Sequence, residues 1–394
     1  MMPARLSAAA PPSDHLHKGR SAEPAWIARL TLTDFRCYAQ ARLEAGPGPI
    51  VLTGPNGAGK TNLLEAVSLL SPGRGLRGAR LGDVQRIGAT PESCLGVAAT
   101  IETKDGETLV GTGREPGTER RAVQIDGKPA KSQAALADLL SVVWVTPQMD
   151  RLFVEGARGR RKFLDRLVFS IDPAHAGRAT RHESGMRQRA KLLVERPHET
   201  SWLDAVEAEL AATGVALAAA RLDMALRLAQ ALSAATGPFP RPLVAAEGAI
   251  ENRLMSDPAL AVEDWLRGAL LRNRAADAAQ GETLAGAHRS DLSVIHAEKN
   301  MPAALSSTGE QKALLVAIVL AAARLAAAET GRVPVLLLDE VAAHLDEDRR
   351  AALFAEIETL GAQAWMTGTD RALFDPLGSR AQGFRVREAH ISKE

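Results

Sequence analysis

The chain has 394 residues, of which 46% are hydrophobic and 24% charged, a composition typical of folded globular proteins and not of disordered ones. This length predicts two or more compact lobes. Lys plus Arg number 48 against 47 Asp plus Glu, for a net charge of +1, so any surface for nucleic acid must come from local clustering of basic residues.

The sequence indicates a cytoplasmic protein with no membrane partner. Its cysteines, Cys37 and Cys94, form no CxxC and adjoin no His pair, so neither a disulfide framework nor a zinc site is indicated. The apolar stretches 211–220 and 313–323 are Ala-rich, flanked by charges and shorter than the roughly 20 residues of a membrane helix. Residues 1–24 lack the apolar core of a signal peptide, and we expect them to form a disordered tail.

Strand patterns dominate the first part of the chain. Residues 26–32 alternate apolar and polar side chains, and residues 50–52 form a short apolar run that leads into a glycine. Further alternating runs occur at 96–101 and 122–125, the second followed by the hairpin-type pair Asp126-Gly127. We therefore expect residues 25–157 to form the amino-terminal half of a larger domain together with a β-rich lobe.

A helical insertion is predicted over residues 158–280. Helical spacing with charged faces runs from Arg158 to about Arg274, with a Pro/Gly-rich break at 237–242. No heptad pattern is sustained, which disfavours a long coiled coil. Strand signals return over 291–296 and in the apolar run 333–338. Residues 281–394 are thus expected to complete an α/β domain that the insertion interrupts.

A glycine-rich segment matches the phosphate-binding loop pattern GxxxxGK[ST] between a predicted strand and a predicted helix, where backbone N–H groups wrap phosphates. Lys60 is expected to contact the β- and γ-phosphate oxygens, and the Thr61 hydroxyl to take one Mg²⁺ position. A plain glycine turn is the less favoured alternative. The predicted nucleotide-binding residues here are Gly54, Pro55, Asn56, Gly57, Ala58, Gly59, Lys60, Thr61 and Asn62.

Two carboxylates follow the apolar run 333–338, at the expected carboxyl end of a buried strand. Asp339 is predicted to hold Mg²⁺ through water, and Glu340 to polarise the attacking water as a general base. The alternative is that the acidic residues only cap the following helix.

The segment Ser307-Thr308-Gly309-Glu310 precedes a long apolar helix and offers either a simple capping box or an anion site. The order of phosphate loop, Gln148 after a strand, SxGE and Asp-Glu resembles the ATP-binding cassette superfamily. That resemblance implies that Ser307 and Gly309 complete the ATP site of a second subunit, and that Gln148 serves both metal binding and catalysis. The long separation of Lys60 from Ser307 requires an insertion, as in the SMC and RecF arrangement.

The motifs quoted next resemble the RecF family of ATPases over about residues 26–390. They are LTDFRCY at 32–38, the phosphate loop with NLLEA at 62–66, RRKFLD at 160–165, RQRAKLL at 187–193, SWLD at 201–204 and AHRSDL at 287–292. The resemblance implies an ATP-binding cassette head with a β-rich lobe and a helical arm. It also places a nucleotide-contacting arginine at Arg36, for which a surface ion pair with Asp34 is the alternative.

The same resemblance implies the function and partners. ATP and Mg²⁺ would drive a transient homodimer on double-stranded and gapped DNA, with slow hydrolysis resetting it. Together with RecR and RecO, the dimer would promote loading of the RecA recombinase in DNA repair, replication restart and the SOS response.

This chain departs from the family pattern at several positions. The family's proline before His-Arg is replaced by Ala287, the residue after Arg289 is Ser290 and not an acid, and the D-loop reads Ala343-His344-Leu345-Asp346. Thr367 stands where the wider superfamily has a switch histidine, which is compatible with slow hydrolysis.

Basic residues gather at the start of the predicted insertion, and those proposed to contact DNA are Arg158, Arg160, Arg161 and Lys162. Further basic residues follow at Arg178, Arg181, Arg187, Arg189 and Lys191. Such a cluster is typical of backbone-phosphate contact, although a charge run is also typical of a solvated helix face. With 4% aromatic residues and no interleaved basic and aromatic motif, base stacking is not expected.

The sequence supports two other functions less well than the RecF-like function. An SMC-like structural clamp requires a long coiled coil, and often a hinge or a CxxC hook. A transporter ATPase needs neither the long insertion nor the RRKFLD segment.

Overall fold

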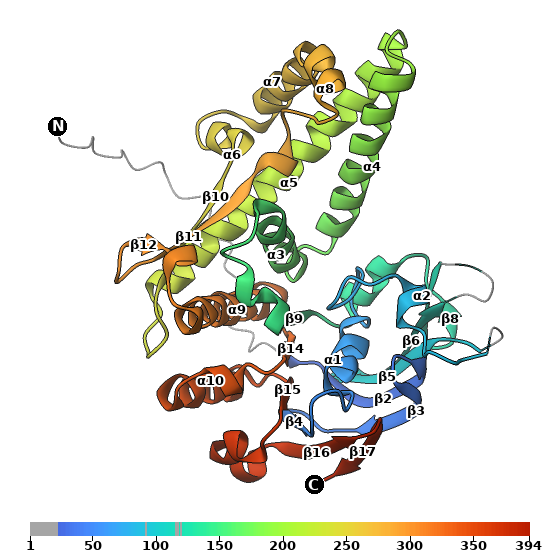
Figure 1. Ribbon diagram of the computed structural model, residues 1–394, viewed down its shortest axis with the longest axis vertical. Coiled ribbons are helices and arrows are strands. Elements are labelled where there is room, and N and C mark those ends of the chain that lie inside the picture. The colour runs from blue at the N-terminus through green and yellow to red at the C-terminus, as the bar shows by residue number, and fades with distance from the viewer. Residues whose placement is uncertain (1–22, 91–92, 115–117, 119) are drawn as a thin grey trace.

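The computed structural model describes residues 23–90, 93–114, 118 and 120–394, and places a head below an arm (Figure 1). The predicted disordered tail lies outside the described residues except for its last two. Those two form strand β1 (Glu23–Pro24), which pairs in parallel with β13 (Arg332–Val333). For Glu23 and Pro24 the prediction of disorder is therefore wrong, because the edge of β13 offers backbone partners that no local pattern shows.

The head is organised around a six-stranded sheet of order β17-β16-β4-β15-β14-β9. Every neighbouring pair is parallel except β16 with the edge strand β17. The predicted strand 333–338 is interrupted at Pro334, which has no N–H for the ladder. The strands are β4 (Pro49–Thr53), β9 (Val142–Val145), β14 (Val335–Leu338), β15 (Ala364–Gly368), β16 (Gln382–Arg387) and β17 (His390–Lys393).

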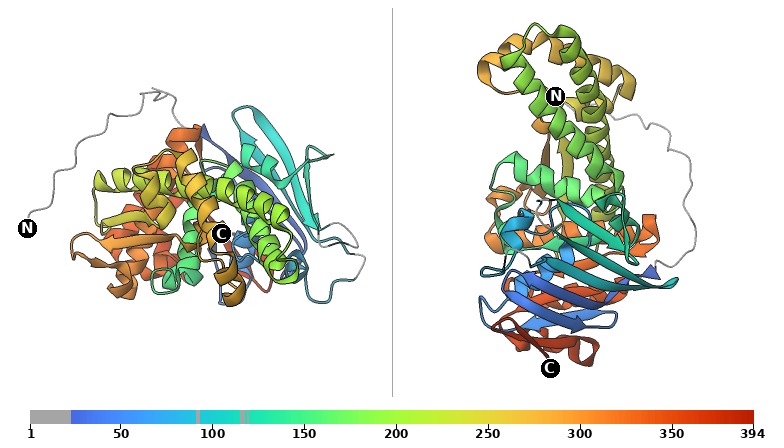
Figure 2. Two further views of the ribbon diagram at one scale, coloured as in Figure 1. Left: turned by 90° about the horizontal axis from the view of Figure 1, so that it is seen from above. Right: turned by 90° about the vertical axis from the view of Figure 1, so that its right-hand side faces the viewer.

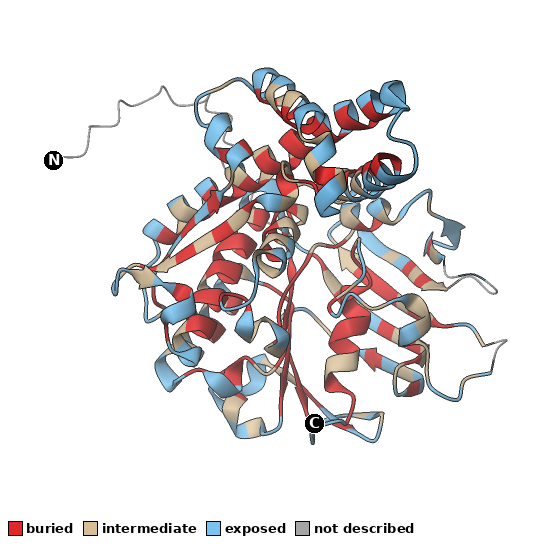
Figure 3. Cartoon of the chain, turned by 45° about the horizontal axis from the view of Figure 1, so that its top comes forward, coloured by how far each residue is buried: buried red, intermediate tan, exposed pale blue. Residues whose placement is uncertain are grey.

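Alternate side chains of this sheet enter two different cores, because successive residues of a strand point to opposite faces. Leu336 and Leu338 pack with α9 (Thr308–Thr330) and α10 (Glu347–Leu360). Leu337 packs on the other face with α1 (Lys60–Ser68) and the β-rich lobe. All four residues of β14 are buried, and the central strands form a buried band through the head (Figure 3). Parallel strands covered on both faces are expected to be continuously apolar.

Helix α9 is the one helix of the described residues with the length and apolarity of a membrane span. However, 67% of its most apolar window is buried inside the protein. Its apolar character is explained by contact with the sheet and with the arm helix α5 (Thr200–Ser233).

The β-rich lobe is an antiparallel sheet of order β3-β2-β5-β6-β7-β8. The predicted hairpin at Asp126-Gly127 is confirmed, and both residues have positive φ, 49° and 74°, as tight hairpin turns require. The lobe comprises β2 (Trp26–Phe35), β3 (Tyr38–Glu44), β5 (Gly96–Thr103), β6 (Gly106–Arg114), β7 (Arg121–Ile125) and β8 (Lys128–Pro129), with the short helices α2 (Leu81–Val84) and η1 (Gln133–Asp138).

The arm is built on a pair of long helices, α4 (Ala174–Glu195) and α5, which pack side by side and rise above the head (Figures 1 and 2). Helix α3 (Ala157–Phe169) forms its base, and α6 (Ala249–Leu254), α7 (Ala259–Arg272) and α8 (Arg274–Gln280) lie against α4 and α5. The predicted helical character of the insertion is thus confirmed for these segments.

One strand of the arm was not predicted. Residues Pro242–Glu247 form β10, which pairs with β11 (Asp291–His296), itself followed by the short β12 (Met301–Pro302). Its alternating burial is that of a half-buried strand. This sheet joins the arm to the carboxyl-terminal half of the head.

Candidate ATP site

The phosphate loop runs from the end of β4 to the start of α1, and its glycines are dictated by geometry. Gly54 has φ 146°, and a Cβ there would lie 2.1 Å from the carbonyl oxygen of Val386. Gly59 has φ 115°, and a Cβ would lie 2.5 Å from the Tyr38 hydroxyl. Gly57 has φ 79° with open space around it. The loop therefore tolerates no side chain at Gly54 or Gly59, and has room for a ligand at Gly57.

Lys60 is the first residue of α1, and its side chain lies back over this loop. Its Nζ donates to the carbonyl oxygens of Gly54 at 2.6 Å and Pro55 at 2.9 Å. Burial lowers the pKa of Lys60, while the carboxylates of Glu340 and Asp339 act in the opposite direction. The ammonium group thus donates to neutral carbonyl oxygens, which phosphate oxygens can replace. It lies at the amino end of a helix, where the helix dipole favours negative charge.

Asp339 lies directly after β14 and faces Thr61. The Thr61 hydroxyl donates to its carboxylate oxygens at 3.0 and 3.1 Å, and the Thr367 hydroxyl donates at 2.7 Å. Burial raises the pKa of Asp339, and these hydrogen bonds oppose the shift. A buried carboxylate beside a threonine hydroxyl fits a Mg²⁺ ion whose remaining ligands are phosphate oxygens and water. In the described part of the chain no cluster of three or more His, Cys, Asp or Glu could hold a metal ion.

Glu340 adopts positive φ, 54°, an uncommon conformation for a residue with a side chain. Its backbone N–H donates to the Thr367 hydroxyl at 2.8 Å. Thr367 thus links Asp339 and Glu340. The sequence predicts no such role for Thr367 and shows only that it replaces the switch histidine. The contact depends on the pairing of β14 with β15, which no local motif shows.

Gln148 lies in the short helix η2 (Pro147–Arg151), directly after β9. Because Val145 of β9 pairs with Leu338 of β14, the chain delivers Gln148 to the same edge of the sheet as Asp339. Gln148 is exposed, and no hydrogen bond of its side chain is found among the described residues. Its metal-binding and catalytic role stays a prediction.

A cleft of about 410 Å³ lies beside the phosphate loop and is lined by Arg36, Cys37, Asn62, Asp83, Gln85, Arg86 and Ile87. Arg36 pairs with Glu65 of α1 through two hydrogen bonds of 2.6 and 2.8 Å. Asp34 pairs instead with Arg86 at 2.7 Å, so the predicted alternative of an Arg36–Asp34 ion pair is wrong. Arg36 and Asn62 line this cleft, whose position beside the phosphate loop suits a nucleotide. Their role in nucleotide binding stays a prediction.

The signature segment is exposed and lies at the start of α9. Ser307 forms the predicted capping box with Glu310. Lys299, 2.5 Å from Glu310, and the Ser307 backbone N–H lower the pKa of Glu310 to about 2. Gly309 has open space around it, and α1 and α9 lie on opposite faces of the sheet (Figure 1). Among the described residues, no hydrogen bond joins Ser307 to the phosphate loop.

The four basic residues proposed for DNA contact fall into two groups. Arg160 pairs with Asp291 at 2.7 Å and donates to the Phe153 carbonyl at 3.1 Å, and Arg161 donates to the Ser290 carbonyl at 2.7 Å. Both therefore join α3 to the start of β11, whereas Arg158 and Lys162 are exposed one helical turn apart.

Farther along the arm, Arg189 is fully buried between Glu207 and Asp277 at 2.8 and 2.7 Å. The predicted membership of Arg189 in a basic surface is wrong, because the turn of α4 carries it into the arm's interior.

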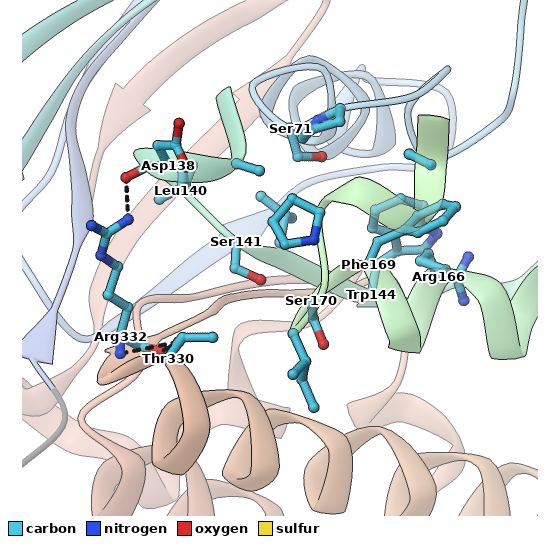
Figure 4. A pocket seen from close by; sticks show the side chains of 16 residues that line it. Ser71, Asp138, Leu140, Ser141, Trp144, Arg166, Phe169, Ser170, Thr330 and Arg332 are labelled. Atoms are coloured by element: carbon cyan, nitrogen blue, oxygen red, sulfur yellow. Dashed lines mark hydrogen bonds between the residues drawn. The ribbon is translucent and has the colours of Figure 1, made fainter. Parts of the chain in front are cut away.

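A separate cavity of about 200 Å³ lies between β9, the junction of α3 with α4, and the end of α9 (Figure 4). Ser141 and Val142 at the start of β9 line it, whereas Gln148 follows the end of that strand. The cavity therefore lies toward the amino ends of the parallel strands, whereas the phosphate loop lies at their carboxyl ends, and the cavity does not belong to the candidate ATP site.

Comparison with known proteins agrees with this geometry. The family model RecF/RecN/SMC N terminal domain matches residues 26–390. The DNA replication and repair protein RecF of Rhizobium rhizogenes (strain K84) is 52% identical over 373 residues, covering 93% of this chain and 98% of the relative. That of Brucella suis biovar 1 (strain 1330) is 49% identical over 384 residues, covering 96% and 98%. This chain belongs to the RecF family.

Solved structures confirm the fold of this RecF family member as an ATP-binding cassette head with an inserted arm. The recombination mediator protein RecF with ATPrS, of the RecFOR pathway, superposes with a TM-score of 0.81 at 22% identity, covering 95% of this chain and 100% of the other. An Smc head domain from Pyrococcus furiosus gives a TM-score of 0.51 at 15% identity, covering 94% and 96%.

Proposed function

We propose that this RecF family member is a cytoplasmic DNA repair and replication protein that binds ATP with Mg²⁺ and then dimerises on DNA. The observation that carries the proposal is the contrast within one chain: Lys60, Thr61 and Asp339 are brought together, while Ser307 and Gly309 stay exposed. Such a division supports an ATP site completed by the signature segment of a second copy. Relatives named DNA replication and repair protein RecF, about half identical over nearly the whole chain, support the biological role.

The proposed reaction assigns a role to each residue of the site. The loop N–H groups and Lys60 bind the phosphate chain, and Thr61 and Asp339 hold Mg²⁺, which would neutralise charge on the phosphates. Glu340 and Gln148 orient the attacking water, with Glu340 accepting its proton. The partner's Ser307 and Gly309 bind the γ-phosphate through the amino terminus of α9. Hydrolysis then removes the group that joins the two copies, and the dimer opens.

The proposed DNA target is a gap or a junction between single-stranded and double-stranded DNA, where the dimer acts with RecR and RecO in loading RecA. Arg158 and Lys162 are the exposed members of the first proposed DNA contact. The arm supports this function over an SMC-like clamp, since α5 has only 34 residues and no long coiled coil extends from the described head.

The test measures DNA affinity and sedimentation of the full chain on gapped, duplex and single-stranded DNA, with and without ATP and Mg²⁺. We expect a dimer only with both ATP and Mg²⁺, and tightest binding to gapped DNA. A protein that binds DNA equally with and without nucleotide, as a monomer, would overturn the proposal.

A further inference from the structure

The β-rich lobe carries a groove that no predicted DNA contact uses. Two adjoining hollows, of about 740 and 600 Å³, share the lining residues Arg121 and Gln133. Thr180 of α4 lines the second hollow, so the groove runs between the lobe and the base of the arm. We call it the basic groove, after its positively charged lining residues Arg74, Arg80, Arg114, Arg120, Arg121 and Lys131.

The charge of the basic groove is one-sided. Among the described residues that line it there is no Asp or Glu, although the whole chain has nearly equal numbers of both signs. Arg74, Arg80, Arg120 and Lys131 are exposed and have no ion-pair partner among the described residues. These four neighbouring positive charges create a local field that attracts a polyanion.

Arg121 gives the groove a fixed positive centre. Its guanidinium donates to the Gly73 carbonyl at 2.6 Å, to Gln133 at 3.1 Å and also to the Leu69 carbonyl. Burial lowers the pKa of Arg121 to about 10, so it remains charged at neutral pH. All of its bonded partners within the described chain are neutral, and a half-buried cation without a carboxylate keeps an uncompensated charge.

The neutral part of the lining indicates what kind of polyanion fits. Gln124, Ser132 and Gln133 supply amide and hydroxyl groups, and no aromatic residue lines either hollow in the described part of the chain. Base stacking requires aromatic faces, whereas Arg, Lys, Gln and Ser are the side chains that contact phosphate and sugar. The exposed Arg181 follows Thr180 on α4 and extends the positive surface toward the arm.

We propose that the basic groove binds the sugar-phosphate backbone of DNA, independently of base sequence, at a surface separate from Arg158 and Lys162. This inference rests on the proposed function, because it assigns a surface to the DNA of that function. Through Arg121 the groove also borders the end of α1, the helix whose first residue is Lys60.

The test uses charge-neutralising pairs in the full chain. Arg74→Gln with Arg80→Gln removes two charges from one hollow, and Arg120→Gln with Lys131→Gln removes two from the other. Arg74→Lys with Arg80→Lys retains the charge. Arg272→Gln with Lys393→Gln is the matched control, since both residues are exposed, lack a described ion-pair partner and lie on α7 and β17. Arg121 is left intact because its bonds to Leu69 and Gly73 support the fold.

Affinity for a gapped duplex is measured with ATP and Mg²⁺ over about 50 to 200 mM salt. Each groove pair is expected to lower the slope of log affinity against log salt by about 1.8, since each lost phosphate contact contributes about 0.9. The Lys pair and the control pair should keep the wild-type slope. Thermal unfolding and ATP binding of each variant verify its fold. If the variant with substitutions in one hollow fails to fold, the variant with substitutions in the other hollow tests the proposal.

If both groove variants keep the wild-type slope and affinity, the basic groove does not bind DNA, and the proposed function is left intact. The groove would equally be overturned if the control pair lowered the slope as much, because the loss would then reflect overall charge. Absence of ATP-dependent DNA binding by the wild type would instead overturn the proposed function, and the groove with it.

Discussion

The two halves of the candidate ATP site differ in how complete they are within one chain. On the phosphate-loop side, Thr61, Asp339 and Thr367 are joined by hydrogen bonds of 2.7 to 3.1 Å. On the signature side, the hydrogen bonds of Ser307 found among the described residues are confined to its own turn of α9. Under the proposed function, this difference assigns nucleotide binding and subunit closure to separate surfaces of the protein, so different substitutions should separate the two activities.

The largest expected effect comes from Lys60→Ala, which removes the ammonium group from the assembled half. ATP hydrolysis should fall by about 100-fold or more, as when a charge-stabilising group is lost from a transition state. Dimerisation with ATP should fall with it, because the phosphates lose a charge-assisted contact. Turnover assays and sedimentation check this, and ATP-driven dimers at wild-type level would show that Lys60 lacks the assigned role.

Ser307→Arg should affect only the exposed half. ATP binding to the monomer should stay near the wild-type value, since Ser307 has no described contact with the phosphate loop, while ATP-driven dimerisation weakens by at least about tenfold because a bulky side chain crowds the interface. Nucleotide titration and sedimentation measure the two effects. Loss of monomer binding would contradict the separation of the two surfaces.

Mixing Ser307→Arg with Lys60→Ala provides the control. A heterodimer then has one site with an intact phosphate loop and an intact signature, so turnover should return to up to about a quarter of wild type if pairing is random. A mixture as inactive as either variant alone would argue against a shared site.

The smallest expected effect is on stability, and Asp339→Asn tests it, because this substitution separates nucleotide binding from stability within the assembled half. Burial raises the pKa of Asp339, so folding disfavours its charged form, and the destabilisation is present above the folded pKa and relieved as pH falls through it. The variant should therefore unfold a few degrees higher at neutral pH, with the difference shrinking in acid, while Mg²⁺-dependent ATP binding is lost. Thermal unfolding across pH and nucleotide titration test both. A lower unfolding temperature at neutral pH would contradict this account.

Sequence patterns predicted what depends on local chemistry. The phosphate loop, the acidic pair after an apolar strand and the capping box at Ser307 each lie within a few residues, and the structure has each in its predicted local setting. Strand β10 was missed because residues 243–246 form a continuous run of apolar side chains, and only their burial alternates in the structure, so the sequence carries no alternating pattern that distinguishes this strand from the helical insertion.

Long-range contacts could not be predicted from such patterns. Arg160 belongs to a basic run in the sequence, but its partner Asp291 is 131 residues away, and only the fold brings them together. Thr367 shows the same limit, since its bond to Asp339 depends on the pairing of two strands. A charge run therefore marks where arginines are, and the three-dimensional packing decides which of them stay available to a partner.

The two cysteines offer a chemical handle on nucleotide occupancy. Cys37 lines the cleft beside the phosphate loop, where the Asn62 amide lies 3.2 Å from its sulfur, while Cys94 is exposed on the β-rich lobe. A nucleotide in that cleft would shield the first thiol from alkylation and leave the second one reactive. The ratio of the two labelling rates would then serve as an internal footprint of occupancy in the unaltered protein, with no engineered probe.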